Sequence, residues 1–120
     1  MKIYNINLKN NIIIGSSKYS SDKIFLKCVK NTEAEMITVA LRKIGDNADN
    51  FYKTLQKTRC KILPNTAGCF SEKEAINTAL MSRDIFETDL IKLEVIENEI
   101  TLAPSIKGTI KAAEKLLKLG

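Results

Sequence analysis

Short runs of β-branched residues alternate along this sequence with longer amphipathic segments, and no other feature constrains the fold as strongly. A segment with helical spacing follows each apolar run. Four strand–helix units in a row predict an α/β fold with a parallel sheet. The repeat of about 25 to 35 residues fits either an eight-fold βα barrel or a doubly wound sheet. The four expected strands are residues 12–14, 36–41, 60–63 and 90–96.

Potential capping residues indicate where the helices begin. Ser21 or Asp22 predicts a helix that runs to about Lys30, and Asp49 or Asn50 predicts the next one. These residue types favour the N-cap because their side chains accept a hydrogen bond from a free backbone N–H. We therefore expect the first two helices at these positions.

The clearest helix signal is Ser71 followed by Glu74, a spacing that fits the capping box. Ser105 predicts the last helix. In both helices the apolar residues recur at helical spacing, which predicts the face that packs on the core. The expected core positions are Ala75, Ile76, Ala79 and Leu80 in the first, and Ile106, Ile110, Ala113 and Leu117 in the last.

Two further expectations concern the strands. Residues 3–8 alternate between apolar and polar side chains, which predicts a hairpin with residues 12–14 across residues 9–11. Pro64 is expected to stop the strand at 60–63, because proline lacks the N–H that a sheet needs.

The length and composition limit the class of protein. The chain has 120 residues, 44% of them hydrophobic, which suits one folded domain and is too apolar for a disordered chain. No apolar stretch approaches the roughly 20 residues of a membrane-spanning helix. The N-terminal residues also lack the pattern of a secretory signal. We therefore expect a soluble, intracellular protein.

Charge and rare residues limit the chemistry. The formal net charge is +5, but 16 lysines are scattered singly, which argues against a nucleic-acid site. The sequence has no histidine, which removes histidine-based catalytic triads and nearly every histidine-based zinc site. The three cysteines lack metal-ligand spacing and are expected to be reduced, packed thiols. We expect neither a metal nor a cofactor.

The segment that includes Lys92 and Glu94 carries the strongest indication of chemistry. In a strand these two side chains share one face, while Leu93 and Val95 share the other. Two charges on the inner face of a buried strand are costly unless they are paired or used. A desolvated lysine becomes an amine nucleophile, whereas a nearby carboxylate favours the ammonium. The alternative is a solvent-facing ion pair on an edge strand.

Two loops follow predicted strands and are weaker candidates. Residues 63–69 contain Asn65, Thr66 and Gly68, whose hydrogen-bonding groups and open backbone suit a ligand site, although an ordinary turn explains them too. Residues 15–19 resemble a plain loop more than an anion site. Neither a dinucleotide fingerprint nor a phosphate-binding P-loop is present, so nucleotide-binding folds lose support. A complete eight-fold barrel needs about 250 residues, so this chain would form half of one.

Together these segments resemble bacterial and plastid thiazole synthases, the barrel enzymes that assemble the thiazole ring of thiamin. Residues 15–19 resemble the family's first loop, 38–42 its second strand, and 63–69 its Asn-Thr-Ala-Gly turn. Residues 91–95 resemble its most characteristic strand, and 102–104 the approach to the next helix. The resemblance implies that residues 1–120 are the N-terminal half of a (β/α)8 domain, with the phosphate site and the C-terminal half absent.

The resemblance also implies site residues, substrates and partners. Lys92 would form a Schiff base with 1-deoxy-D-xylulose 5-phosphate, and Glu94 would act as the acid–base group. Asn65 and Thr66 would bind substrate. Dehydroglycine and a sulfur-carrier protein with a C-terminal thiocarboxylate would supply the remaining atoms. The complete enzyme would be a transferase that forms a homo-oligomer in the bacterial cytoplasm or the plastid stroma.

Some residues depart from the family pattern, and other functions stay open. Ser16 and Ser17 follow Gly15 where the family has Gly-Thr-Gly, and Ser105 stands where it commonly has Asp. The 120-residue chain alone is expected to be inactive and poorly stable. The alternatives are a non-catalytic truncated barrel, another imine-forming enzyme of the class I aldolase type, and, with least support, a basic nucleic-acid module.

Overall fold

The computed structural model describes residues 1–45 and 47–120. It divides into two compact units, which are considered one at a time. The first unit comprises Met1–Val39 and Ile44–Leu63, and the second comprises Ala40–Lys43 and Pro64–Gly120. None of the helices in the described residues is long and apolar enough to span a membrane.

The N-terminal strands form a small antiparallel hairpin of their own. β1 (Lys2–Ile3) pairs with β2 (Ile6–Asn7), and Tyr4 adopts the left-handed conformation with φ of 51°. This tight turn closes the hairpin within seven residues. The predicted hairpin between residues 3–8 and 12–14 is therefore wrong. The reason is that the later strand finds its partner elsewhere, in a parallel sheet.

That sheet has three strands in the order β3-β4-β5. β3 (Ile13–Gly15) runs parallel to β4 (Met36–Ala40), and β5 (Lys61–Asn65) lies next to β4. Helix α1 (Asp22–Thr32) connects the first two strands. A 3-10 turn, η1 (Leu41–Lys43), and helix α2 (Ala48–Thr58) connect the second and third. The repeated strand–helix order confirms the predicted α/β class.

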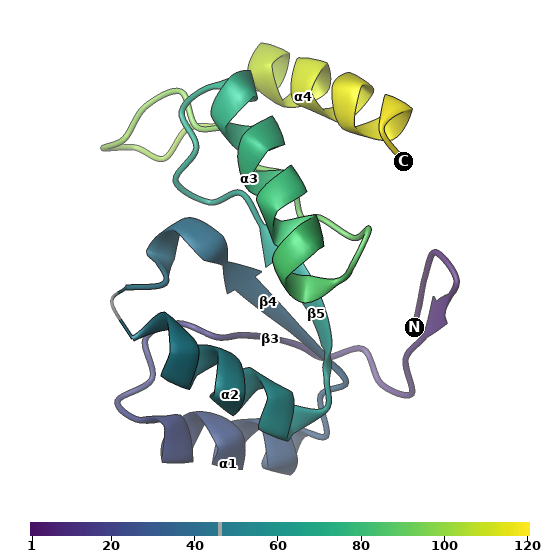
Figure 1. The fold of residues 1–120 in the computed structure, drawn as a ribbon, viewed down its shortest axis with the longest axis vertical. Coiled ribbons are helices and arrows are strands. Elements are labelled where there is room, and N and C mark those ends of the chain that lie inside the picture. Colours follow the sequence, from purple (N-terminus) through teal and green to yellow (C-terminus); the bar gives the residue numbers. More distant parts are fainter. Residues whose placement is uncertain (46) are drawn as a thin grey trace. The chain divides into compact units, whose positions relative to one another are not determined.

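Burial and capping explain the first unit. Met36, Ile37 and Val39 of β4 are fully buried, as expected for a central strand of a parallel sheet. Ser21 caps α1 as predicted, because its hydroxyl accepts a hydrogen bond from the N–H of Ile24. Helix α2 begins slightly earlier than predicted, with Asn47 at the N-cap. The two helices pack side by side (Figure 1).

Pro64 does not stop its strand. It lies inside β5, the last strand in the sheet order, and its carbonyl accepts a hydrogen bond of 2.8 Å from the Lys92 N–H. The backbone of Pro64 thus faces residues 90–96, so its missing N–H removes no bond from the ladder with β4. The predicted stop at Pro64 is therefore wrong by two residues.

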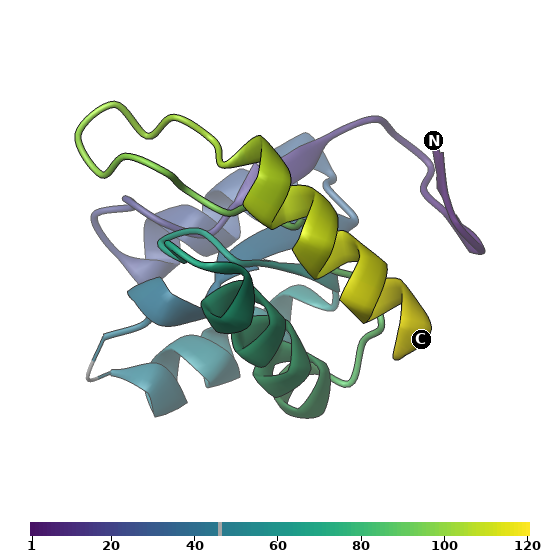
Figure 2. The ribbon, with the colours of Figure 1, turned by 90° about the horizontal axis from the view of Figure 1, so that it is seen from above.

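The second unit contains two long helices that lie against each other (Figures 1 and 2). α3 (Glu72–Phe86) is capped by Ser71 and α4 (Ile106–Lys118) by Ser105, as predicted. The carboxylate of Glu74 accepts from the N–H of Phe70 instead of the cap residue, a shifted form of the capping box. Between the helices lies a buried cluster of Cys69, Ala75, Val95 and Ala112.

The face of α4 that packs on this cluster is not the predicted one. Ala112 is fully buried, whereas Ile106, Ile110 and Leu117 are exposed. The apolar residues of α4 extend over a wide arc, and small residues at one edge of the arc allow the closest approach. Gly108 and Ala112 therefore face the core, whereas Ile106, Ile110 and Leu117 remain exposed.

Residues 90–96 are extended but do not form a regular strand. Within the described residues they make two isolated bridges, from Lys92 to Asn65 and from Ile96 to Pro104. The predicted fourth strand is therefore wrong as a continuous ladder. A side chain interrupts it, because the Thr66 hydroxyl hydrogen-bonds to the backbone of Glu94.

Candidate functional site

The candidate site forms where the carboxyl end of β5 meets residues 90–96. The parallel bridge joins Asn65 to Lys92. The Lys92 N–H donates to the Pro64 carbonyl at 2.8 Å, and the Thr66 N–H donates to the Lys92 carbonyl at 3.3 Å. The main chain of Lys92 is thus held at the end of a strand, the position where barrel enzymes place catalytic residues.

A compact turn, residues 64–69, follows the strand and extends this contact. The Ala67 N–H donates to the Asn65 side-chain oxygen at 3.1 Å, and the Cys69 N–H donates to the Thr66 carbonyl at 3.1 Å. Gly68 has φ of +87°, a conformation that side chains other than glycine adopt rarely. We call residues 64–69 the clamp turn, because they also hydrogen-bond to residues 90–96.

The side chains of residues 92–95 alternate as predicted. Val95 belongs to the buried cluster between α3 and α4, and Leu93 packs against it. Lys92 and Glu94 therefore lie on the opposite face of the segment. Their side chains form an ion pair with 2.8 Å between Nζ and Oε1. The amine and the carboxylate are close enough to exchange a proton directly.

The pair is not buried, contrary to expectation. The side chain of Lys92 is 51% exposed and that of Glu94 is 35% exposed. These exposures agree with the alternative interpretation of the sequence, a solvent-facing ion pair. The catalytic role of Lys92 and Glu94 stays a prediction.

Asn65 and Thr66 lie next to the pair but are largely inaccessible. Asn65 is 6% exposed and Thr66 is fully buried. The Thr66 hydroxyl donates to the Glu94 carbonyl and accepts from the Glu94 N–H, each at 2.7 Å. The structure brings all four predicted site residues together in one unit. Substrate binding by Asn65 and Thr66 stays a prediction.

Sequence reasoning missed a second polar cluster in this unit. Arg42 of η1 pairs with Glu74 at 3.4 Å and lies 3.9 Å from the sulfur of Cys69. The hydrogen bond to Cys69 is the main cause that raises the pKa of Arg42. The Phe70 N–H, and then Arg42, lower the pKa of Glu74. The sequence signal that could have indicated this cluster is the position of Arg42, directly after the predicted strand at 36–41.

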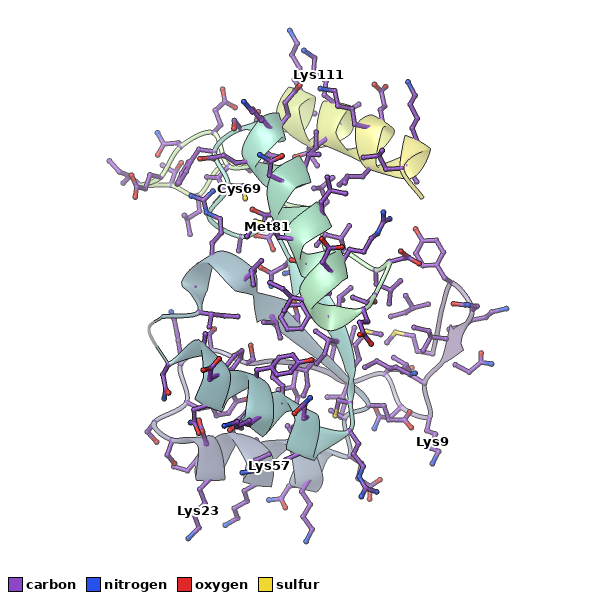
Figure 3. All side chains as sticks on the ribbon, viewed as in Figure 1. Lys9, Lys23, Lys57, Cys69, Met81 and Lys111 are labelled. Carbon is purple, nitrogen blue, oxygen red and sulfur yellow. The ribbon has the colours of Figure 1, made fainter. Side chains whose placement is uncertain are left out.

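Cys69 itself has a structural environment. Its thiol is fully buried and lies 3.4 Å from the Thr78 hydroxyl, beside the start of α3 (Figure 3). It is part of the apolar cluster between the helices. These contacts agree with the predicted packing role.

Fold and site define a class of protein: an α/β chain of consecutive strand–helix units with a paired lysine and carboxylate at the end of a parallel strand. Over residues 2–120 the chain matches the family model described as Thiazole biosynthesis protein ThiG. The chain belongs to this family. The predicted resemblance is thereby confirmed.

Curated relatives support the same assignment. The chain is 38% identical over its whole length to a thiazole synthase of Neisseria meningitidis serogroup C, covering 47% of that protein. It is 41% identical to a thiazole synthase of Rhodopseudomonas palustris, again over the whole chain and 47% of the relative. A thiazole synthase of Rhizobium etli is 36% identical over 97% of the chain. The chain spans about half the length of the relatives it matches.

Proposed function

We propose that residues 1–120 supply the first four strand–helix units of a (β/α)8 thiazole synthase. Family membership supports this proposal. The sheet order β3-β4-β5 is consecutive, and Lys92 then bridges to β5. A doubly wound sheet reverses its strand order at a switch point, whereas a barrel adds each strand beside the preceding one. The consecutive order favours the barrel.

In the proposed reaction Lys92 forms an imine with the ketone of 1-deoxy-D-xylulose 5-phosphate. The lysine ammonium first gives one proton to Glu94. The free amine then adds to the ketone carbon, and the ketone oxygen leaves as water with the two remaining hydrogens of the nitrogen. The 2.8 Å separation of Nζ and Oε1 is the observation that carries this proposal.

Glu94 then acts on the carbon next to the imine. Glu94 first returns its proton to the imine nitrogen, which gives an iminium ion and restores the carboxylate. The iminium ion acidifies the neighbouring C–H bonds, and the carboxylate can remove one such proton and return it elsewhere. This shifts carbonyl character along the sugar. Dehydroglycine and sulfur from a thiocarboxylated carrier protein would then complete the thiazole phosphate.

Borohydride reduction tests the imine. In the complete protein encoded by the reading frame, we expect 1-deoxy-D-xylulose 5-phosphate and borohydride to label Lys92, as located by peptide mass spectrometry. Lys92→Arg should abolish the label. Lys111→Arg is the matched control, because its side chain is 54% exposed, close to the 51% of Lys92. Labelling at another lysine, or none in the unaltered protein, would contradict the assignment.

The same assay separates the proposal from another imine-forming enzyme. A thiazole synthase should be labelled by the pentulose phosphate in preference to a triose phosphate ketone. Equal or stronger labelling with the triose would favour an aldolase-type activity instead.

A further inference from the structure

The fully buried hydroxyl of Thr66 has an unusual arrangement: it hydrogen-bonds to both backbone groups of one distant residue. It donates to the Glu94 carbonyl and accepts from the Glu94 N–H, with 2.7 Å in each case. The two residues are 28 positions apart in the chain. The side chain therefore replaces the main-chain ladder bonds that Glu94 would otherwise make.

The clamp turn holds residues 90–96 at three points. Pro64 and the Thr66 N–H bind the backbone of Lys92, the Thr66 hydroxyl binds that of Glu94, and the Cys69 carbonyl accepts from Ile96 at 2.8 Å. The middle point alone depends on a side chain. Because threonine is stiff at χ1, its hydroxyl is held in one direction.

We propose that Thr66 is a positioning residue for the Lys92–Glu94 pair, which acts through the backbone of Glu94 in place of the direct substrate contact predicted from the sequence. This inference rests on the proposed imine chemistry at Lys92. Small displacements of a reacting group cost rate steeply, and fixing the Glu94 backbone limits the positions from which its carboxylate can reach the lysine amine. Loss of the hydroxyl leaves the Glu94 N–H and carbonyl unpaired and frees the segment to shift.

The test compares Thr66→Val, which keeps the shape and loses the hydroxyl, with Thr66→Ser, which keeps the hydroxyl. In the complete protein we expect Thr66→Val to lower the maximal rate of borohydride trapping about tenfold to a hundredfold. The half-saturating ketone concentration should change less than about twofold, because Thr66 does not touch the substrate. Thr66→Ser should restore the rate to within about threefold of the unaltered protein, since its hydroxyl can make the same bonds.

Two outcomes overturn the inference while leaving the proposed function intact. One is trapping by Thr66→Val at the unaltered rate. The other is a raised half-saturating concentration with an unchanged maximal rate, which would make Thr66 a direct substrate contact.

A measurement without substrate separates this inference from the proposed function. Acetic anhydride labels Lys92 and Lys111 in competition, and we expect Thr66→Val to change the ratio while Thr66→Ser preserves it. If 1-deoxy-D-xylulose 5-phosphate and borohydride never label Lys92, the proposed function fails. The ratio of acetylation at Lys92 to that at Lys111 still tests whether Thr66 positions the lysine. An equal ratio in all three proteins would overturn it.

Hydrogen exchange covers the case in which Thr66→Val does not fold. In the unaltered protein the Glu94 amide should exchange slowly, because its hydrogen points at the buried Thr66 hydroxyl. Exchange at the rate of an unstructured peptide would overturn the inference. Slow exchange that persists in Thr66→Ser would support it.

Discussion

Gly108 of α4 packs directly against Val95, so that a Cβ built on Gly108 would lie 3.0 Å from Val95 Cγ1 and equally close to Ser105 Oγ. Val95 is 2% exposed and belongs to the cluster between α3 and α4. The close packing of Val95, on the face opposite Lys92, therefore requires a residue without a side chain at position 108. This contact links the stability of the second unit to the placement of residues 90–96.

We predict that Gly108→Ala destabilises the protein by about 1 kcal/mol in urea unfolding followed by circular dichroism. Alanine favours a helix over glycine by about 1 kcal/mol, but overpacking costs about 1–3 kcal/mol. We expect the overpacking cost to exceed the gain in helix propensity, because the buried, branched side chain of Val95 has little room to move. Gly15→Ala is the control, since no atom lies within 4 Å of its Cβ position. Higher stability in Gly108→Ala would contradict the packing described.

Acid should weaken the protein partly through Glu74. The Phe70 N–H, and then Arg42, hold the pKa of this carboxyl below its ordinary value of 4.5. The ionised form therefore stabilises the fold above that value, and this contribution is lost as the pH falls through the lowered pKa. Glu74→Gln should flatten the dependence of unfolding free energy on pH in this acid range.

Arg42→Gln separates the two causes. Because the backbone hydrogen bond from Phe70 is the larger one, most of the acid dependence should survive the loss of Arg42. If Arg42→Gln flattens the pH profile as much as Glu74→Gln, the ion pair is the dominant cause instead.

The exposed apolar side chains of α4 should promote self-association of the 120-residue chain. Ile106, Ile110 and Leu117 are 72%, 55% and 77% exposed on one helix. Contiguous exposed apolar residues of this kind favour association. We predict that Ile110→Gln lowers the mean particle mass in light scattering without loss of helical signal. Ala112 lies two positions away and is fully buried, so Ala112→Gln should unfold the second unit. Unfolding by Ile110→Gln, with Ala112→Gln tolerated, would refute this orientation of α4.

The three cysteines should differ in reactivity. Cys69 is fully buried, whereas Cys28 and Cys60 are partly accessible. We predict that a thiol reagent labels Cys69 last, at a rate set by local opening of the second unit. Peptide mass spectrometry resolves the three sites, and urea should remove the difference. Labelling of Cys69 as fast as Cys28 in the native protein would contradict its burial.

Local sequence signals predicted much of the fold correctly. Ser21, Ser71 and Ser105 cap the helices as expected, because each cap bonds to an N–H three residues away. The alternation around Lys92 also correctly placed Leu93 and Val95 together on the face opposite Lys92 and Glu94, and this face packs in the buried cluster. These features depend on residue type and short spacing, which are readable from one sequence.

The errors arose where a choice depended on distant residues. The face of α4 was mistaken because Gly108 and Ala112 approach the core more closely than large side chains can. The hydrogen bonds of the Thr66 hydroxyl to the Glu94 backbone were missed because the two residues are 28 positions apart. Pro64 continues its strand because its backbone faces the distant residue Lys92 instead of β4, which no local pattern reveals.

The sequence by itself determined the α/β class, the helix caps and the shared face of Lys92 and Glu94, because these follow from interactions between near neighbours in the chain. Only the tertiary structure decided that Thr66 binds the Glu94 backbone, that α4 turns Ala112 inward and that Lys92 remains half exposed. Burial and long-range hydrogen bonds depend on which segments meet in space, and packing selects among faces that the sequence pattern leaves equivalent.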